Sequence, residues 1–128
     1  MAGGDLEAFR AAGRTLFSLG LVKGSEGNLS IFDGERLWIS RTGCELVHLS
    51  ESDVLEGSLD APPAGSSSDL AIHVRMYRER GSGAIAHAHP LGTVPEGWTE
   101  GEPHGWYAHA ATLTEAVRAI VSDARTGT

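Results

Sequence analysis

Cysteine and long apolar runs are the features that this sequence most clearly lacks. Cys44 is the only cysteine in 128 residues, which excludes an internal disulfide and any metal site built from several thiolates. A bound metal would therefore need histidine and carboxylate ligands. No apolar stretch approaches the roughly 18 residues of a membrane-spanning helix, so we expect no membrane association.

Basic residues are also scarce. The chain has 10 Lys and Arg residues and 17 Asp and Glu residues, which gives a formal net charge of -7. This excess argues against general affinity for nucleic acid or anionic lipid. The first residues carry acids where a signal peptide would carry Lys or Arg, so we expect a cytoplasmic protein. A hydrophobic content of 41% suits a globular chain, and the length predicts a single domain over 1–128.

The first half of the chain predicts a helix followed by a hairpin. Apolar residues at spacings of three and four predict a helix over 5–19, with Gly20 as its C-cap. Asp33-Gly34 lies between NLSIF and ERLWIS, a pattern typical of an antiparallel hairpin with a primed turn. The stretch 42–66 is predicted to be irregular apart from a short strand near 45–47.

The second half predicts two helices around a buried strand. A helix is expected from Asp69 to Arg80, capped by Ser67 or Ser68, and the pattern over 84–89 predicts a strand stopped by proline. Residues 91–103 are predicted as loop, and Thr112 with Glu115 makes a capping box for the last helix. The order predicts an α/β layered fold with a mainly antiparallel sheet flanked by helices.

His87 and His89 form the first candidate site. Residues two apart on a strand point to the same face, so their imidazoles lie where one cation can bridge them. Two histidines can equally alternate on a solvated face. The small apolar neighbours, such as Ala86 and Ala88, favour metal, because buried imidazoles without partners are costly.

Two further segments have both a structural and a functional interpretation. Asp69, after three serines, is either an acid on a helix dipole or an acid/base group beside an anion pocket. KGSEGNLS (23–30) is either a turn or a nest in which Gly24 and Gly27 expose amides to an anion, with Asn28 as a further donor.

Five segments together resemble the class II aldolase/adducin family, in the order in which the family carries them. They cover nearly the whole chain and are GLVKGSEGNLS (20–30), ISRTG (39–43), SSSDLAIHVRMYRER (66–80), AIAHAHP (84–90) and EPHGWYAHAATLTEAV (102–117). The resemblance implies the family's layered fold, a homotetramer, and action on a small phosphorylated sugar or polyol.

The resemblance also implies a set of site residues. Zinc, or another divalent metal, would be held by His87, His89 and His104, with His109 as the rival of His104. The acid/base position falls on Asp69, where the family's aldolases carry glutamate. Phosphate is expected at Gly27, Asn28, Thr42, Gly43, Ser67 and Ser68.

The mechanism that this implies is aldol cleavage. Zinc on three neutral imidazoles keeps its charge and an open position, so it can polarise the substrate and stabilise an enediolate. Aspartate is one methylene shorter than glutamate, and a shift of about 1.5 Å can cost on the order of 10²-fold in rate. The stretch between His89 and His104 is also shorter than in the family, and Arg41 replaces a common proline.

Three functions are therefore carried forward. The first is a zinc-dependent aldolase-type lyase acting on a small sugar phosphate. The second is a non-catalytic, adducin-like binding or assembly module, which Asp69 and the short 89–104 segment favour. The third is an epimerase or dehydratase that uses the same metal chemistry on another substrate.

Overall fold

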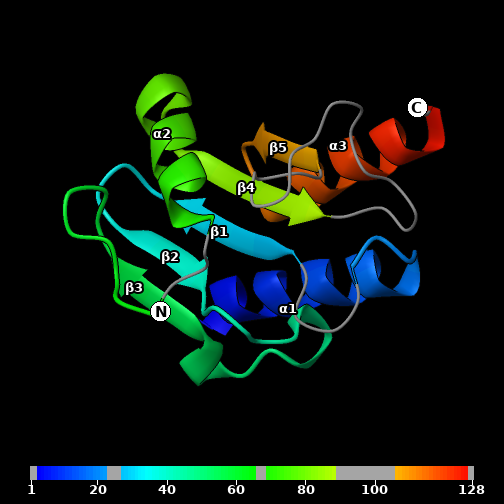
Figure 1. Cartoon of the computed structure of the whole chain (residues 1–128), viewed down its shortest axis with the longest axis horizontal. Coiled ribbons are helices and arrows are strands. Elements are labelled where there is room, and N and C mark those ends of the chain that lie inside the picture. Colours follow the sequence, from blue (N-terminus) through cyan, green and yellow to red (C-terminus); the bar gives the residue numbers. More distant parts are fainter. Residues whose placement is uncertain (1–2, 23–26, 66–68, 89–105, 127–128) are drawn as a thin grey trace, which may run out of the picture.

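The computed structural model describes residues 3–22, 27–65, 69–88 and 106–126, and it places them in one sheet with three α-helices (Figure 1). The sheet has five strands in the order β3-β2-β1-β4-β5, and each paired neighbour is antiparallel. This confirms the predicted fold class. The elements are α1 Gly3–Ser18, β1 Asn28–Phe32, β2 Leu37–Ser40, the 3-10 helices η1 Leu46–His48 and η2 Glu51–Asp53, β3 Val54–Gly57, α2 Leu70–Arg80, β4 Gly83–Ala88, β5 Trp106–Ala110 and α3 Leu113–Thr126.

The two faces of the sheet carry different side chains. Successive residues of a strand point to opposite faces, and β4 alternates accordingly. Ala84, Ala86 and Ala88 pack in a cluster with α1 and α3, whereas Ile85 packs in a second cluster with Tyr77 of α2. The sheet therefore separates α2 from the pair formed by α1 and α3 (Figure 1).

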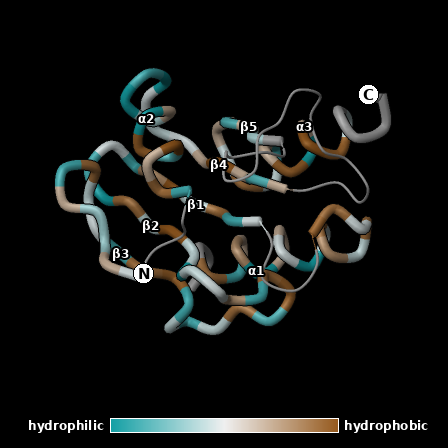
Figure 2. Tube along the Cα trace, viewed as in Figure 1, coloured by the Kyte–Doolittle hydropathy of each residue, from teal (hydrophilic) through white to brown (hydrophobic). Residues whose placement is uncertain are grey.

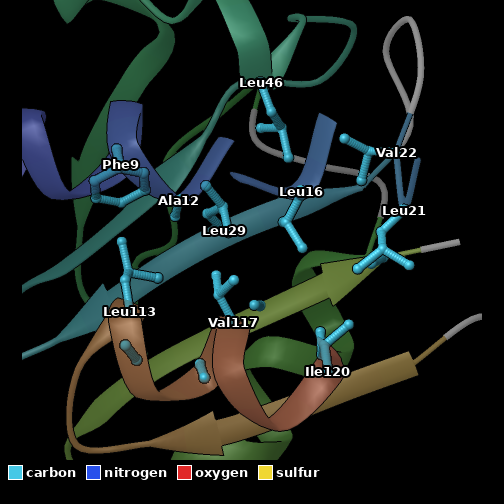
Figure 3. Close-up of a cluster of buried hydrophobic side chains, with 14 of the residues drawn as sticks. Phe9, Ala12, Leu16, Leu21, Val22, Leu29, Leu46, Leu113, Val117 and Ile120 are labelled. Atoms are coloured by element: carbon cyan, nitrogen blue, oxygen red, sulfur yellow. The ribbon is translucent and has the colours of Figure 1, made fainter. Parts of the chain in front are cut away.

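The larger core lies between the sheet, α1 and α3. Side chains from these elements point toward one another, with Leu29 of β1 among them (Figure 3). Small alanines on β4 let the helices approach closely, and most of the bulky residues come from α1 and α3. The fully or nearly fully buried members include Phe9, Leu16, Leu29, Leu46, Leu113, Val117 and Ile120.

Two predicted helix ends are confirmed: α1 ends at Gly20, and α3 begins after Thr112. Gly20 adopts a positive φ of 74°, and the amides of Gly20 and Leu21 return to carbonyls of the last helical turn, as in a Schellman C-cap. At the start of α3 the amide of Glu115 donates to Thr112 Oγ1 at 3.2 Å. Thr112 is therefore the N-cap that the sequence predicts.

The hairpin between β1 and β2 is also confirmed. Gly34 has a φ of 105°, which fits a primed turn. The Asp33 amide donates to the Arg36 carbonyl at 3.1 Å, so the two loop residues are Gly34 and Glu35. Asp33 Oδ1 accepts the amides of Glu35 and Arg36 and closes the turn.

The secondary structure differs from the expectations at η1 and β3, and β5 adds a strand where none was expected. Residues 46–48 form the 3-10 helix η1 rather than a strand, because Leu46 is buried against α1, where the Gly13 position approaches its carbonyl. Strand β3 is not predicted, since an edge strand that is only half buried lacks a clear apolar alternation. Strand β5 is not predicted because its last three residues are Ala-His-Ala, and alanine is depleted in strands.

Apolar and polar segments follow the layers (Figure 2). The outer end of α2, which contains Arg78, Glu79 and Arg80, is hydrophilic, while β1 and the inner side of α1 are mainly apolar. In the described ranges, no helix is both long and apolar enough to span a membrane.

Candidate active site

Several predicted site residues meet at one edge of the sheet. Antiparallel pairing places the start of β1 beside the end of β4, with Asn28 opposite His87. It also places the start of β1 beside the end of β2, where the Leu29 amide donates to Ser40 Oγ at 3.1 Å. The sheet register therefore brings the Gly27-Asn28, Thr42-Gly43 and His87 segments together.

The predicted phosphate turn lies beside the chain that leads to the serine-rich segment. The Thr42 amide donates to the Gly65 carbonyl at 2.9 Å, and Gly43 has a positive φ of 79°. Ser67 and Ser68 lie outside the described residues. The two residues that flank the serine-rich segment, Gly65 and Asp69, therefore contact the Thr42 and Asn28 segments respectively.

Both the close packing around position 27 and its backbone conformation require glycine there. Its φ is 78°, a region that favours glycine. A Cβ atom there would lie 2.8 Å from the His87 carbonyl oxygen and 2.7 Å from Val22 Cγ1. The predicted special conformation of Gly27 is confirmed, whereas Gly24 lies outside the described residues.

The Asp69 carboxylate points into this edge rather than at the helix amides. Asp69 is the N-cap residue of α2, but its side chain makes no capping hydrogen bond. Its Oδ2 lies 2.8 Å from Asn28 Nδ2 and 2.9 Å from His87 Nδ1. The expected caps Ser67 and Ser68 lie outside the described residues, and the Asp69 side chain contacts Asn28 and His87 rather than the first amides of α2.

These contacts determine the charge of Asp69. The hydrogen bond with His87 lowers the pKa of the carboxyl group, burial opposes this, and the Asn28 amide lowers it further, to about 2. Asp69 is therefore ionised at neutral pH and accepts hydrogen bonds only. Both Asn28 and His87 donate to the same oxygen, which explains why Asn28 Nδ2 and His87 Nδ1 lie only 3.2 Å apart.

A buried polar chain continues from Asn28 under α2. His73 is fully buried; its Nε2 contacts Asn28 Oδ1, and its Nδ1 lies 2.6 Å from Ser30 Oγ. Ser30 Oγ lies 2.7 Å from the Tyr77 hydroxyl. Both ring nitrogens of His73 therefore have hydrogen-bond partners. Ser30 and Tyr77 are partners that the sequence reasoning does not name, although both follow the strand and helix periods set by Asn28 and His73.

Tyr107 closes the site on the side of β5. Its ring stacks on the His87 ring, with centroids 3.8 Å apart and planes 10° from parallel. Its hydroxyl is buried. Burial raises the pKa of the Tyr107 phenol, and the negative charge of Asp69 adds to this rise. Tyr107 is therefore a neutral wall against the His87 ring.

The other predicted metal ligands are only partly described. His89 and His104 lie outside the described residues. His109 pairs with Ile85 rather than with His87, and its Nε2 donates to the Gly81 carbonyl at 3.0 Å. Within the described parts of the chain, no three His, Cys, Asp or Glu side chains gather in a group that could hold a metal.

The Arg41 side chain forms an ion pair with Asp53 beside the Thr42-Gly43 turn. Its guanidinium lies 2.6 Å from Asp53 Oδ1, and its amide donates to the Asp53 carbonyl at 2.7 Å. Asp53 also accepts from Ser50. The residue that replaces the common proline therefore ties the turn to η2.

Comparison with known proteins identifies the family of this site. The model of the family described as "Class II Aldolase and Adducin N-terminal domain" matches residues 7–96. The chain belongs to this family. The class II aldolase match includes the Asn28, Asp69 and His87 segments, so the edge described above lies within the residues that the family model covers.

Two relatives and one solved structure illustrate the similarity. An L-fuculose phosphate aldolase of Methanocaldococcus jannaschii is 33% identical over 90 residues, which are 68% of this chain and 50% of the relative. A methylthioribulose-1-phosphate dehydratase of Bradyrhizobium sp. is 36% identical over 89 residues, 67% of this chain and 41% of the relative. The crystal structure of L-fuculose-1-phosphate aldolase from Thermus thermophilus superposes with a TM-score of 0.65 at 35% identity, over 70% of this chain and 48% of that one.

The chain thus spans about half the length of the class II aldolase relatives that it matches. Both relatives are named as enzymes of sugar phosphates. Family and fold are established by these matches, while the reaction of this chain is a matter for proposal.

Proposed function

We propose that this chain is a divalent-metal-dependent lyase that cleaves a small sugar phosphate, as an aldolase does. The observation that carries the proposal is the contact of Asp69 with His87 at the edge where the Gly27 and Thr42 turns meet. A carboxylate, an imidazole and two glycine turns are the groups that such a reaction needs for proton transfer, metal binding and phosphate binding.

The described part of the site fits a metal ion at His87. When Nδ1 donates its proton to the Asp69 carboxylate, the lone pair of the neutral ring lies on Nε2. A histidine that binds a metal commonly donates its other N–H to a carboxylate in this way. His87 is 1% exposed, so its orientation is fixed. His89 and His104 are the proposed remaining ligands, since His109 is engaged with Gly81.

Zinc is the proposed cation, and when bound it would polarise the substrate oxygens and stabilise an enediolate. Asp69 is the proposed proton-transfer group. Its carboxylate is ionised and held by two donors, so it starts as a base. Its contact with His87 also orients that ring, a second role that the shorter aspartate side chain suits.

The proposed phosphate pocket consists of Gly27, Asn28, Thr42, Gly43, Ser67 and Ser68. Positive φ at Gly27 and Gly43 is the backbone conformation in which successive amides can face an anion. The Asn28 side chain is engaged with Asp69 and His73, so its contribution to phosphate would be through the backbone of its segment.

A dehydratase is the second candidate, because a dehydratase matches this chain at 36% identity, alongside an aldolase at 33%. Both reactions need proton removal beside an oxygen bound to a cation. The non-catalytic adducin-like module is not favoured, because the relatives are named as enzymes. The single domain over 1–128, the homotetramer and the cytoplasmic location stay predictions.

Metal analysis is the first test. The protein purified without added metal should contain one equivalent of zinc, and His87→Ala should lose it. His48→Ala is the matched control, because His48 is an exposed histidine and should leave the metal content unchanged. A folded protein without metal would refute the proposal.

Substrate tests then separate the candidates. The full chain should cleave at least one member of a panel of ketose 1-phosphates, and Asp69→Asn should abolish cleavage. Loss of water from methylthioribulose 1-phosphate without carbon-carbon cleavage would select the dehydratase. No turnover in either assay, even with Asp69→Glu, would point to the binding module.

A further inference from the structure

A continuous hydrogen-bond chain links α2 and β1 behind the proposed catalytic edge. It runs from Tyr77 through Ser30, His73 and Asn28 to Asp69. Ser30 and His73 are fully buried, and Asn28 and Tyr77 nearly so. Of these residues, only Asn28 and Asp69 belong to the predicted site. A buried polar network is costly unless every member is hydrogen-bonded, so its presence here calls for an explanation.

The contact between Asn28 and Asp69 sets the direction of the bonds in the chain. Asn28 Nδ2 donates to Asp69 Oδ2 at 2.8 Å, so the Asn28 oxygen is the atom that faces His73. His73 must then carry its proton on Nε2. Burial lowers the pKa of His73 to about 3, so the ring is neutral and Nδ1 is an acceptor.

The remaining two bonds follow in the same way. Ser30 must donate its hydroxyl proton to His73 Nδ1, so the Ser30 oxygen accepts from the Tyr77 hydroxyl. Burial raises the pKa of Tyr77, which keeps this hydroxyl protonated and able to donate. Each group thus has one consistent role, and reversing any bond would leave two donors or two acceptors facing each other.

We propose that Ser30, His73 and Tyr77 are positioning residues, which hold the Asn28 amide with its NH2 group on Asp69 and thereby orient Asp69 toward His87. This deepens the proposed function, on which the importance of Asp69 rests. Without the Ser30 hydroxyl, His73 can move its proton to Nδ1. The Nε2 lone pair then faces Asn28, which favours the flipped amide, and the flipped oxygen repels the carboxylate.

The sequence periods explain why these residues meet. Asn28 and Ser30 are two apart on β1 and share one face. Asp69, His73 and Tyr77 are four apart along the first turns of α2 and share one side. Packing α2 over β1 therefore aligns the two polar rows, and one chain of bonds forms between them.

Nuclear magnetic resonance of imidazole nitrogens tests the proposal on the full chain as purified, with any zinc that it retains. Long-range proton–nitrogen spectra distinguish Nδ1–H from Nε2–H tautomers. In the wild type, His73 should be neutral with its proton on Nε2, and His87 should carry its proton on Nδ1. Ser30→Ala should shift both histidine signals and those of the Asn28 side-chain amide.

Ser40→Ala is the matched control. Ser40 is equally buried and lies on the neighbouring strand, but its hydroxyl accepts from the Leu29 amide, outside the chain. It should cost stability without changing either histidine tautomer. If Ser30→Ala does not fold, Tyr77→Phe replaces it, because this change removes only the hydroxyl that donates to Ser30. It should move the His73 Nδ1 signal.

Activity provides a second, separate readout. If the chain is a lyase, Ser30→Ala should lower kcat about tenfold, as expected for a displaced reacting group, while KM changes by less than about twofold. A wild-type His73 with its proton on Nδ1 would overturn the proposal. The proposal would also be overturned if Ser30→Ala shifted the NMR signals of the two histidines and of Asn28 no more than Ser40→Ala does. The protein could also show the proposed histidine tautomers but contain no metal and have no activity. That result would overturn the proposed function and leave the positioning role intact.

Discussion

Alanine at Gly27 gives a sharp test of how tightly β1 and β4 approach at the site. The backbone there has a φ of 78°, where an L-residue costs roughly 1–2 kcal/mol. Alanine also restricts the unfolded chain, which offsets about 0.4–1 kcal/mol of that cost. The new methyl group would further lie 2.8 Å from the His87 carbonyl oxygen, and overpacking of this kind costs about 1–3 kcal/mol.

Gly43→Ala separates the two effects. Gly43 has a φ of 79°, so the backbone cost and the unfolded-state effect are the same. Nothing lies within 4 Å of a Cβ built there, so the overpacking is absent. We therefore expect Gly27→Ala to lose about 1–3 kcal/mol more than Gly43→Ala in free energy of unfolding.

Urea unfolding followed by far-ultraviolet circular dichroism measures this difference. The slope of the free energy against urea should not change between the variants, so the midpoints report stability directly. Equal losses, within about 0.5 kcal/mol, would refute the close approach of Gly27 to His87. If His87 binds metal as proposed, Gly27→Ala should also reduce the metal content, because the strain falls on the His87 backbone.

Three further predictions concern the core and the buried histidine. Gly13→Ala should destabilise by at least about 2 kcal/mol, because its Cβ would lie 2.0 Å from the Leu46 carbonyl oxygen; urea stability equal to the wild type would contradict this packing. Ile120→Ala should cost about 2–5 kcal/mol, since Ile120 is fully buried in the core, and a loss below about 1 kcal/mol by thermal unfolding would contradict that. His73 has a pKa lowered by burial from 6.5 to about 3, so between these values the unfolded chain binds a proton that the native state does not. The free energy of unfolding should therefore fall as pH decreases through this window, by up to about 1.4 kcal/mol per pH unit. His73→Gln should remove that slope, and an unchanged slope in urea titrations at about pH 5 and 6, inside this window, would exclude His73 as its cause.

The local elements were largely predictable because their signals are local. Gly20 and Thr112 end and begin helices through their own backbone and side chain, and Gly34 forms the hairpin turn. The strands β3 and β5 were not predictable in this way. They lie at the two edges of the sheet, where pairing with one neighbour, rather than a burial pattern, makes a segment a strand.

Within the described residues, part of the candidate site was predictable as a set of residues but not as a geometry. The resemblance named Asn28, Asp69 and His87, and all three meet. It did not reveal that Asp69 would contact His87 rather than cap α2, because a capping bond and a bond across the sheet suit the same side chain. The supporting partners Ser30 and Tyr77 carry no motif of their own.

The sequence alone was enough to determine which polar residues share a face of a strand or a side of a helix. It placed Asn28 with Ser30 on one strand face and His73 with Tyr77 on one helix side, and it assigned glycine to the positions with positive φ. That these two polar rows face each other and end at Asp69 and His87 was settled by tertiary packing alone. The physical reason is that hydrogen-bond partners 41 to 47 residues apart are chosen by how α2 packs on the sheet, and that packing is set by the apolar residues of both.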